Sequence, residues 1–289
     1  MDAKRPGGGP ATAGQIVITR LPGSLVVAKL ATSRLRRLLF AAILPAVVLV
    51  VWWGITASGA VERYFLPRPD ATLAAAGEML GTSSFWRDMG WSWARIVGGF
   101  MLAAGAAIPC GIAMGRNRTF NLLVEPAISF IRFVPMPAII PLMILWFGSG
   151  EWGKWMIICL GVFFQLVLMV ADVVANVPEA YYDIAHSVHA TRWQRLRHFT
   201  LPAAAPGIWD SLRINFGLAW ATLIFAEILG ATSGLGYLIV SSQRYLLTER
   251  IFVAVVVIGI MGVLADMLFE RLYHLWFPWS AQGQRKESV

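Results

Sequence analysis

Charged residues are scarce in this chain. Asp, Glu, Lys and Arg together make up 14% of its 289 residues, whereas a soluble domain carries about 25% charge. Hydrophobic residues reach 57%, and the mean hydropathy is +0.65. These proportions exclude an ordinary soluble domain and predict a polytopic membrane protein.

Cysteine and histidine are rarer still, with two Cys and four His in the whole chain. Cys110 and Cys159 lie inside apolar runs, so they predict neither a disulfide framework nor a metal set. His186 and His189 stand three residues apart, but the zinc site that such a pair could begin has no evident third ligand. We therefore expect no metal.

Known catalytic signatures are absent as well. No His-Glu-x-x-His, Gly-x-Ser-x-Gly or paired-carboxylate arrangement occurs in an apolar run, which argues against an intramembrane enzyme. A stand-alone channel or secondary carrier is a second alternative. It would need its own coupling-ion site, and the two halves of the chain show no repeat of the kind that many carriers contain.

Long apolar runs dominate what is present. A helix needs roughly 20 apolar residues to cross the hydrocarbon core, and six runs qualify, so we predict an all-α membrane protein with six transmembrane helices. The third run contains Pro135, Pro137 and Pro141, where we expect a kink or a break that bundled helices tolerate. The runs are residues 38–56, 93–114, 123–147, 155–175, 208–230 and 251–273.

Basic residues are distributed unevenly between the loops. If the N-terminus is inside, the inner segments hold fourteen Lys and Arg and the outer segments hold six. Positive residues favour the cytoplasmic side, so we predict that both termini are cytoplasmic. The net charge of +8 lies in loops that flank apolar runs, which indicates contact with membrane lipid rather than nucleic acid.

The order of these segments predicts the domain organisation. The first apolar run lacks a cleavage site directly after it, so we expect a retained signal-anchor. The amphipathic residues 231–250 predict an outer helix that lies against the bundle. The expected regions are a cytoplasmic tail (1–37, flexible over 1–30), the first transmembrane helix (38–56), an outer connection (57–90), a five-helix transmembrane domain (91–273) and a cytoplasmic tail (274–289).

One polar, basic segment, residues 176–206, separates the fourth and fifth apolar runs. Helix connections can be far shorter, and this one carries no catalytic set, so we expect a docking surface for another protein. Pro178 suits a helix start. Tyr182, Ala185 and His189 then share one face at i, i+3 and i+7, and we expect the small Ala185 to let a partner approach closely.

A second helix is expected after a turn at Ala190-Thr191. It carries Arg192, and Leu201-Pro202 ends it and opens the fifth span. The segment resembles the cytoplasmic loop of the membrane subunits of ATP-binding-cassette (ABC) importers. That loop has the pattern Glu-Ala-Ala, three residues, Gly, nine residues, Ile, one residue, Leu-Pro, and this chain has Asp183-Ile184-Ala185, His189, Phe199 and Leu201-Pro202 at the same spacing.

His189 in place of Gly is the main departure from that pattern, because Gly permits a positive φ. His is among the residues that tolerate left-handed geometry, so we expect the turn to survive. Other stretches resemble the nitrate, sulfonate and taurine branch of these importers, and the resemblance covers residues 60–275. These stretches are residues 93–100, 141–151, 217–220, 226–231 and 233–237.

The resemblance implies a type I ABC importer permease of MetI-like fold in the bacterial inner membrane, moving a small anion such as nitrate, a sulfonate or taurine. It implies a homodimer with two ABC ATPase subunits and an external substrate-binding protein. This chain has no phosphate-binding loop, so it binds no cofactor, and ATP and Mg belong to the ATPase. The implied ATPase-coupling residues are Glu179, Tyr182, Asp183, Ala185, His186, His189, Arg192, Leu201 and Pro202.

Polar residues within the spans are candidates for the translocation pathway. Arg132 and Pro135 precede the third span's proline-rich part, and Arg132 is either a pathway residue or half of an ion pair. Glu227 is better explained by a cation partner or a helix–helix hydrogen bond than by contact with an anion. Trp220 lines the path or packs against neighbours.

Three further features predict packing rather than transport. Asp210 and Arg213 stand at i, i+3, which favours a local pair, and Asp172 and Asp266 lie where inner-face basic residues can pair with them. Gly111-x-x-x-Gly115 matches the small-xxx-small contact pattern. Packing within the bundle is its default interpretation, and a dimer contact is the alternative.

Overall fold

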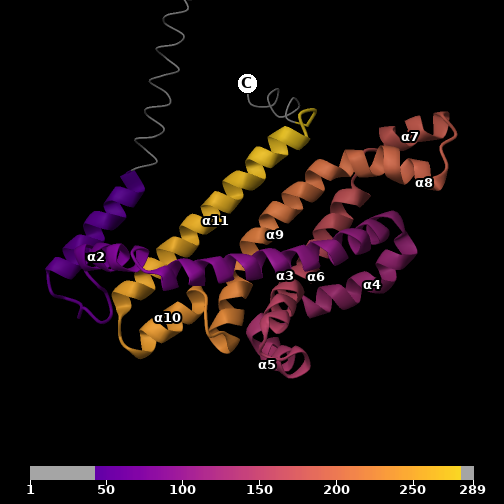
Figure 1. The fold of residues 1–289 in the computed structure, drawn as a ribbon. Helices are drawn as coiled ribbons and strands as arrows, with labels where there is room; N and C mark the ends of the chain where they lie inside the picture. Colours follow the sequence, from indigo (N-terminus) through magenta and orange to yellow (C-terminus); the bar gives the residue numbers. More distant parts are fainter. Residues whose placement is uncertain (1–42, 281–289) are drawn as a thin grey trace, which may run out of the picture.

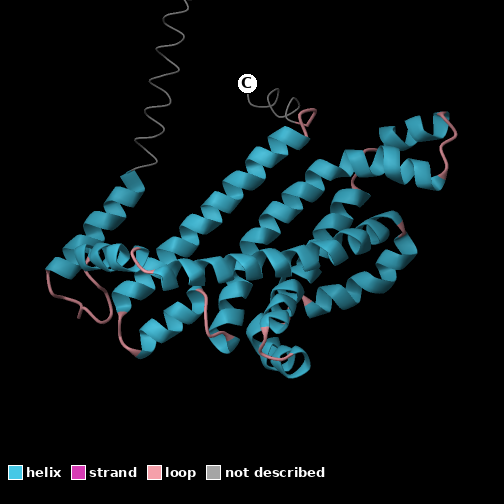
Figure 2. Cartoon of the chain, viewed as in Figure 1, coloured by secondary structure: helices cyan, strands magenta, loops and turns pink. Residues whose placement is uncertain are grey.

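A computed structural model describes residues 43–280, and within that range every regular element is a helix (Figure 2). The predicted all-α class is confirmed for this part of the chain. The expected N-terminal tail, the start of the first span and residues 281–289 lie outside it. The helices are Ile43–Ala57, α2 (Pro69–Leu80), α3 (Ser83–Arg116), α4 (Arg118–Ile131), α5 (Met136–Phe147), α6 (Glu151–Ala175), α7 (Glu179–Ser187), α8 (Arg192–Arg195), the π-helical turn η1 (Leu196–Thr200), α9 (Leu201–Gly230), α10 (Leu235–Arg244) and α11 (Thr248–Trp276).

Four of these stretches are long and apolar enough to cross a membrane: Ser83–Arg116, Glu151–Ala175, Arg192–Ile228 and Thr248–Trp276. A fifth candidate span exists if α4 and α5 count together. The described part of the first apolar run is a shorter apolar helix, Ile43–Ala57. The described residues thus contain four or five candidate spans, where the sequence predicted six.

The third predicted span, 123–147, is broken into α4 and α5, which meet at an angle of 99°. Proline explains the break, because it lacks an N–H group and disfavours helical geometry in the residue before it. Pro135 caps α5, and Pro137 lies in its first turn. The predicted disruption at the prolines is confirmed.

The core forms where α3 packs along α6, and small residues on α3 allow the close approach. A Cβ atom on Gly111 would lie 2.7 Å from Cβ of Val170, and one on Gly115 would lie 2.6 Å from the carbonyl oxygen of Ala171. The Gly111-x-x-x-Gly115 pattern therefore closes a contact within the bundle, as its default interpretation predicted.

The helices between residues 57 and 90 were not anticipated. The predicted outer connection contains α2 and the start of α3, and Pro69 at the start of α2 is a signal that the sequence offered. The predicted amphipathic helix within 231–250 is α10, which packs against α9, α11 and α3. Its position against the bundle is confirmed.

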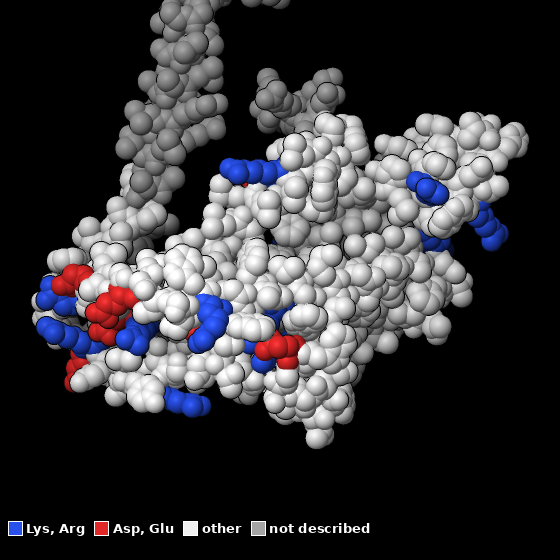
Figure 3. Space-filling view, viewed as in Figure 1, with Lys and Arg blue, Asp and Glu red and all other residues white. Residues whose placement is uncertain are grey.

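The bundle has two structurally different ends. Figure 1 shows α7 and α8 projecting together beyond α6 and α9, whereas α10 lies across the opposite end. We call these the α7 end and the α10 end. On the face in Figure 3, much of the surface is uncharged, and charged side chains gather around α2 while Lys and Arg mark the α7 end.

Candidate functional site

Helix α7 begins after Pro178, whose φ of −55° and ψ of 138° place it just outside the helix. It ends in a Schellman motif, in which the N–H of His189 donates to the carbonyl of His186 (2.9 Å) and the N–H of Ala190 donates to that of Ala185 (3.0 Å). His189 occupies the position after the cap, where glycine is usual, with φ of 51°. The prediction that histidine preserves this turn is confirmed.

Helix α8 follows as a second short helix. The Thr191 hydroxyl accepts a hydrogen bond from the backbone N–H of Gln194 (3.3 Å). The side-chain Oε1 of Gln194 accepts one from the backbone N–H of Thr191 (2.8 Å), which completes a capping box. The chain continues through η1 directly into α9, where Leu201 and Pro202 form the first turn. The segment with α7 and α8 is therefore joined to the long helix α9 without a loop.

One face of α7 packs against its own chain. Ala185 is fully buried, and Tyr182 is partly buried beneath Arg116, whose guanidinium carbon lies 5.4 Å from the ring centroid. The prediction that Ala185 faces a partner is wrong. Its small side chain instead lets the chain fold back after the Schellman turn, so that η1 packs against α7.

A neighbouring face of α7 is exposed and apolar. Tyr181, Ile184 and Val188 recur at i, i+3 and i+7 with 43%, 56% and 62% of their surface exposed, and Trp193 on α8 is 66% exposed. We call these four residues the α7 face. An exposed apolar patch of this kind marks an interaction site. Its helical spacing was visible in the sequence but was overlooked in favour of the Ala185 side.

Other exposed side chains of α7 and α8 are charged or polar. Glu179, Asp183, His186 and Arg192 are all exposed, and His186 Nε2 lies 3.3 Å from Arg195 Nη1. The α7 end thus presents exposed apolar and exposed polar side chains, both of which occur at protein interfaces.

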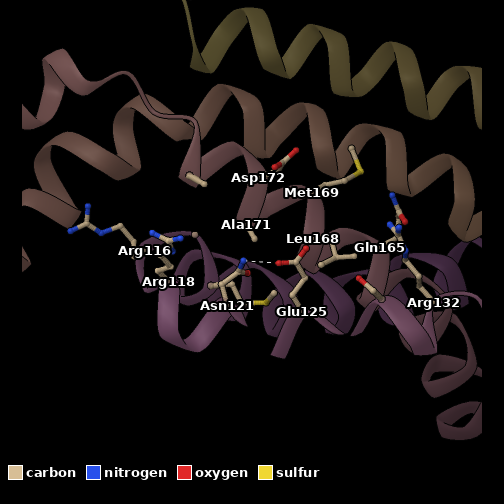
Figure 4. Close-up of a pocket in the computed structure, with 14 residues that line it drawn as sticks. Arg116, Arg118, Asn121, Glu125, Arg132, Gln165, Leu168, Met169, Ala171 and Asp172 are labelled. Atoms are coloured by element: carbon tan, nitrogen blue, oxygen red, sulfur yellow. Dashed lines mark hydrogen bonds between the residues drawn. The ribbon is translucent and has the colours of Figure 1, made fainter. Parts of the chain in front are cut away.

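A cavity of about 560 Å³ lies between α4 and the adjoining halves of α3 and α6. Its lining is rich in polar side chains, and Arg132 stands at one end of it (Figure 4). Among residues 43–280, Arg132 has no ion-pair partner. The polar lining consists of Arg116, Arg118, Asn121, Glu125, Ser129, Arg132, Gln165 and Asp172.

The α10 end holds a buried ionic network instead. Arg95 and Glu227 have 1% and 0% of their side chains exposed, and Arg95 Nη1 lies 2.8 Å from Glu227 Oε1. Arg95 also binds Glu151 through two nitrogens, at 2.7 and 2.8 Å. The Ser92 hydroxyl donates to Glu227, so α3, α6 and α9 are tied together.

The loop before α10 completes this network. Arg95 Nη1 donates to the carbonyl of Ser233 (2.6 Å), and the N–H of Gly236 donates to Glu227 Oε2 (2.8 Å). Gly234 has φ of 109°, and a Cβ atom there would lie 2.3 Å from Glu227 Oε1. Glycine is thus required where the loop passes over the ion pair.

The sequence comparisons identify the chain's relatives. Residues 107–279, more than half of the chain, match the family described as binding-protein-dependent transport system inner membrane component. The chain belongs to this family.

Curated relatives place this permease in the nitrate, sulfonate and taurine branch. It is 34% identical to the taurine transport system permease protein of Escherichia coli K12, over 83% of this chain and 89% of the relative. It is 30% identical to a putative aliphatic sulfonates transport permease protein of Bacillus subtilis, over 82% and 86%. A bicarbonate transport system permease protein of Synechococcus elongatus is 30% identical over 63% of this chain and 66% of the relative.

The solved structures confirm the fold class. A chain from the MetNI methionine ABC transporter, described as inward facing, superposes with a TM-score of 0.60 and 18% identity. The match covers 66% of the permease and 95% of that chain. The MetI-like fold predicted for the permease is therefore shown, and at this identity the likeness concerns the fold alone.

The predicted pathway residues of the permease do not converge. Arg132 lines the cavity, and Pro135 caps α5 at the bend. Glu227 lies in the α10-end network with a cation partner, as the pairing interpretation expected. Trp220 is buried against Trp93, with ring centroids 5.9 Å apart, and does not line the cavity.

Two predicted pairings have different outcomes in the permease. Arg213 does not pair with Asp210 but reaches across to α11, where it binds Asp266 (Nη2 to Oδ2, 2.6 Å) and Glu270 (3.3 Å). The local pair is therefore wrong, because α11 offers Arg213 two carboxylates at once. Asp266 has the basic partner expected for it, whereas Asp172 has no ion-pair partner in the described part of the chain.

No cluster of three or more His, Cys, Asp or Glu suited to a metal ion occurs among the residues that the structure describes. Arg95 is the functional-looking residue that sequence reasoning missed. An ionisable side chain within an apolar run is itself a signal, and Glu227 in the fifth predicted span is its partner.

Proposed function

We propose that this permease is the membrane subunit of an ATP-driven importer for a small oxyanion-bearing solute. Its relatives are named for taurine, aliphatic sulfonates and bicarbonate. These solutes share a compact oxyanion group. The observation that carries the proposal is the α7 face, an exposed apolar patch joined through η1 to a spanning helix.

The α7 face supports docking of a separate ATPase subunit. Large apolar side chains form this face, and Glu179, Asp183 and Arg192 are exposed elsewhere on α7 and α8. Because this sequence lacks a phosphate-binding loop, ATP and Mg bind the partner. We assign two ATPase subunits to a homodimer of the permease, as the family resemblance implies.

Motion of the ATPase is then transmitted to the membrane helices because α8, η1 and α9 are consecutive in the chain. Helix α7 packs against η1, and η1 runs into α9 without a loop. A displacement of α7 therefore moves a rigid spanning element, which is a rigid-body transition between two states. The ATP-bound partner drives it by binding one state more tightly than the other.

Orientation and span number belong to the same proposal. The excess of basic residues in alternate loops puts the α7 end and both termini in the cytoplasm, so the α10 end faces the external binding protein. The first apolar run, 38–56, is proposed as the sixth span. A stand-alone carrier or channel gains no support from the three relatives described above, which are named as transport system permease proteins or transport permease proteins.

Ile184→Asp tests the docking assignment. A buried, unpaired carboxylate in an apolar interface is costly, so we expect the ATPase to be lost during purification and uptake to fall to background. Ser187→Asp is the matched control, because it adds the same charge to an exposed position of α7 outside the α7 face. Normal ATPase recovery and uptake with Ile184→Asp would refute the assignment.

A further inference from the structure

The cavity between α3, α4 and α6 is not needed for ATPase docking, yet three arginines line it. Arg116 is the last residue of α3, Arg118 is the first residue of α4, and Arg132 caps the other end of α4. Figure 4 shows Arg116 and Arg118 towards one end of the cavity and Arg132 at the other. The two ends of one helix thus supply arginines to a single cavity.

These three guanidinium groups lack carboxylate partners. None of them forms an ion pair with any residue in 43–280, unlike Arg95 and Arg213, which each bind two carboxylates. The guanidinium fork matches the geometry of an oxyanion, and hydrogen bonds between ions are the strong ones. An oxyanion in the cavity would supply the partner that the protein does not.

Two carboxylates limit the charge that the cavity accepts. Glu125 and Asp172 also line it, and Glu125 Oε2 accepts a hydrogen bond from Asn121 Nδ2 (2.7 Å). Three cations against two carboxylates leave one net positive charge. That balance suits a monoanion, such as a sulfonate or bicarbonate, better than a dianion such as sulfate.

Arg116 connects this cavity to the coupling segment. Its guanidinium lies over the Tyr182 ring of α7 at 5.4 Å, and Nη1 lies 3.5 Å from Thr200 Oγ1 at the end of η1. An oxyanion that attracts Arg116 therefore competes with a contact that supports α7. The cavity and the α7 end share this one side chain.

We propose that the cavity binds a small monoanionic oxyanion at either of its ends, with Arg118 as the donor at one end, Arg132 as the donor at the other and Arg116 as the link to α7. The assignment rests on the proposed transport function and names the residues that would receive the solute inside the permease. An anionic lipid headgroup presents the same monoanionic oxyanion chemistry, so the test must separate the two sources.

The test uses the permease–ATPase complex without its binding protein, in phosphatidylcholine nanodiscs, titrated with sodium ethanesulfonate and followed by saturation-transfer NMR. We expect saturable binding that weakens at least tenfold in the double variant Arg118→Gln, Arg132→Gln. Sodium sulfate should bind more weakly than ethanesulfonate. Arg271→Gln is the matched control, because Arg271 is an exposed arginine of α11 that does not line the cavity, and it should bind like the unmodified chain.

Equal affinity in the double variant, or tighter binding of sulfate, would overturn the proposal. Adding phosphatidylglycerol to the nanodiscs separates the sources. The site would be assigned to lipid instead if phosphatidylglycerol abolished ethanesulfonate binding to the unmodified chain and co-purified with the unmodified chain but not with the double variant. Sulfonate uptake by the complete transporter is measured in parallel, so that failure of this site alone remains distinguishable from failure of the transport function.

Discussion

Charged side chains are buried and paired at one end of this bundle and exposed without ion-pair partners at the other. At the α10 end, Arg95 and Glu227 are buried and each finds several partners. At the α7 end, Arg116 and Arg118 lack ion-pair partners in the described chain, and large apolar side chains are exposed. A buried ion must be paired within its own protein, whereas exposed apolar side chains and unpaired arginines are available to bind another molecule. This contrast supports the proposal that the α10 end is a scaffold and that other molecules bind at the α7 end.

The largest effect should come from breaking the α10-end network. Glu227→Ala leaves Arg95 buried with one carboxylate fewer, and removing one member of a buried pair costs about 3–5 kcal/mol. We expect a lower thermal unfolding midpoint in detergent and poor membrane yield. Unchanged stability would contradict the claim that the buried network at the α10 end stabilises the fold.

Ala185→Leu should produce the next largest effect. Ala185 of α7 is fully buried against the rest of its own chain. Overpacking such a core position costs about 1–3 kcal/mol. We expect faster hydrogen exchange across α7 and α8. If the α7 and α8 amides stayed protected from exchange while the ATPase was lost, Ala185 would be a contact with the partner rather than with its own chain.

Tyr182 permits a finer comparison of ring and hydroxyl. Tyr182→Phe keeps the aromatic face that Arg116 covers, whereas Tyr182→Ala removes a cation–π contact worth about 0.5–2 kcal/mol. Protection of α7 amides from exchange should therefore be normal in Tyr182→Phe and reduced in Tyr182→Ala. Equal behaviour of the two variants would contradict the contact.

The smallest effect is expected at His189. A left-handed conformation costs a non-glycine residue roughly 1–2 kcal/mol, and His189 adopts φ of 51°. His189→Gly should slightly slow exchange at the α7 cap, and His189→Val should speed it. The opposite order would mean that the histidine side chain itself supports the turn.

Sequence reasoning predicted the features that depend on local chemistry. The break at Pro135 and Pro137, the turn at His189 and the helix within 231–250 all follow from proline geometry, left-handed tolerance or amphipathic pattern. The family resemblance predicted the MetI-like fold and indicated residues 176–206 as the segment that contacts an ATPase. Each of these signals lies within a short stretch of chain.

The errors concern contacts between distant segments. Ala185 was placed on the wrong side of α7 because the chain's return after the Schellman turn is a tertiary event. Arg213 was given a neighbour at i, i+3, although two carboxylates on α11 bind it. The role of Arg95 depends on residues 56 and 132 positions away, which no local pattern reveals.

Photo-crosslinking in native membranes tests the central claim most directly. A photoreactive residue at Ile184, on the α7 face, should yield a covalent product with the ATPase, whereas one at Tyr237, an exposed side chain of α10, should yield none. The account predicts that pattern in the assembled transporter. An ATPase product from Tyr237 and none from Ile184 would contradict it.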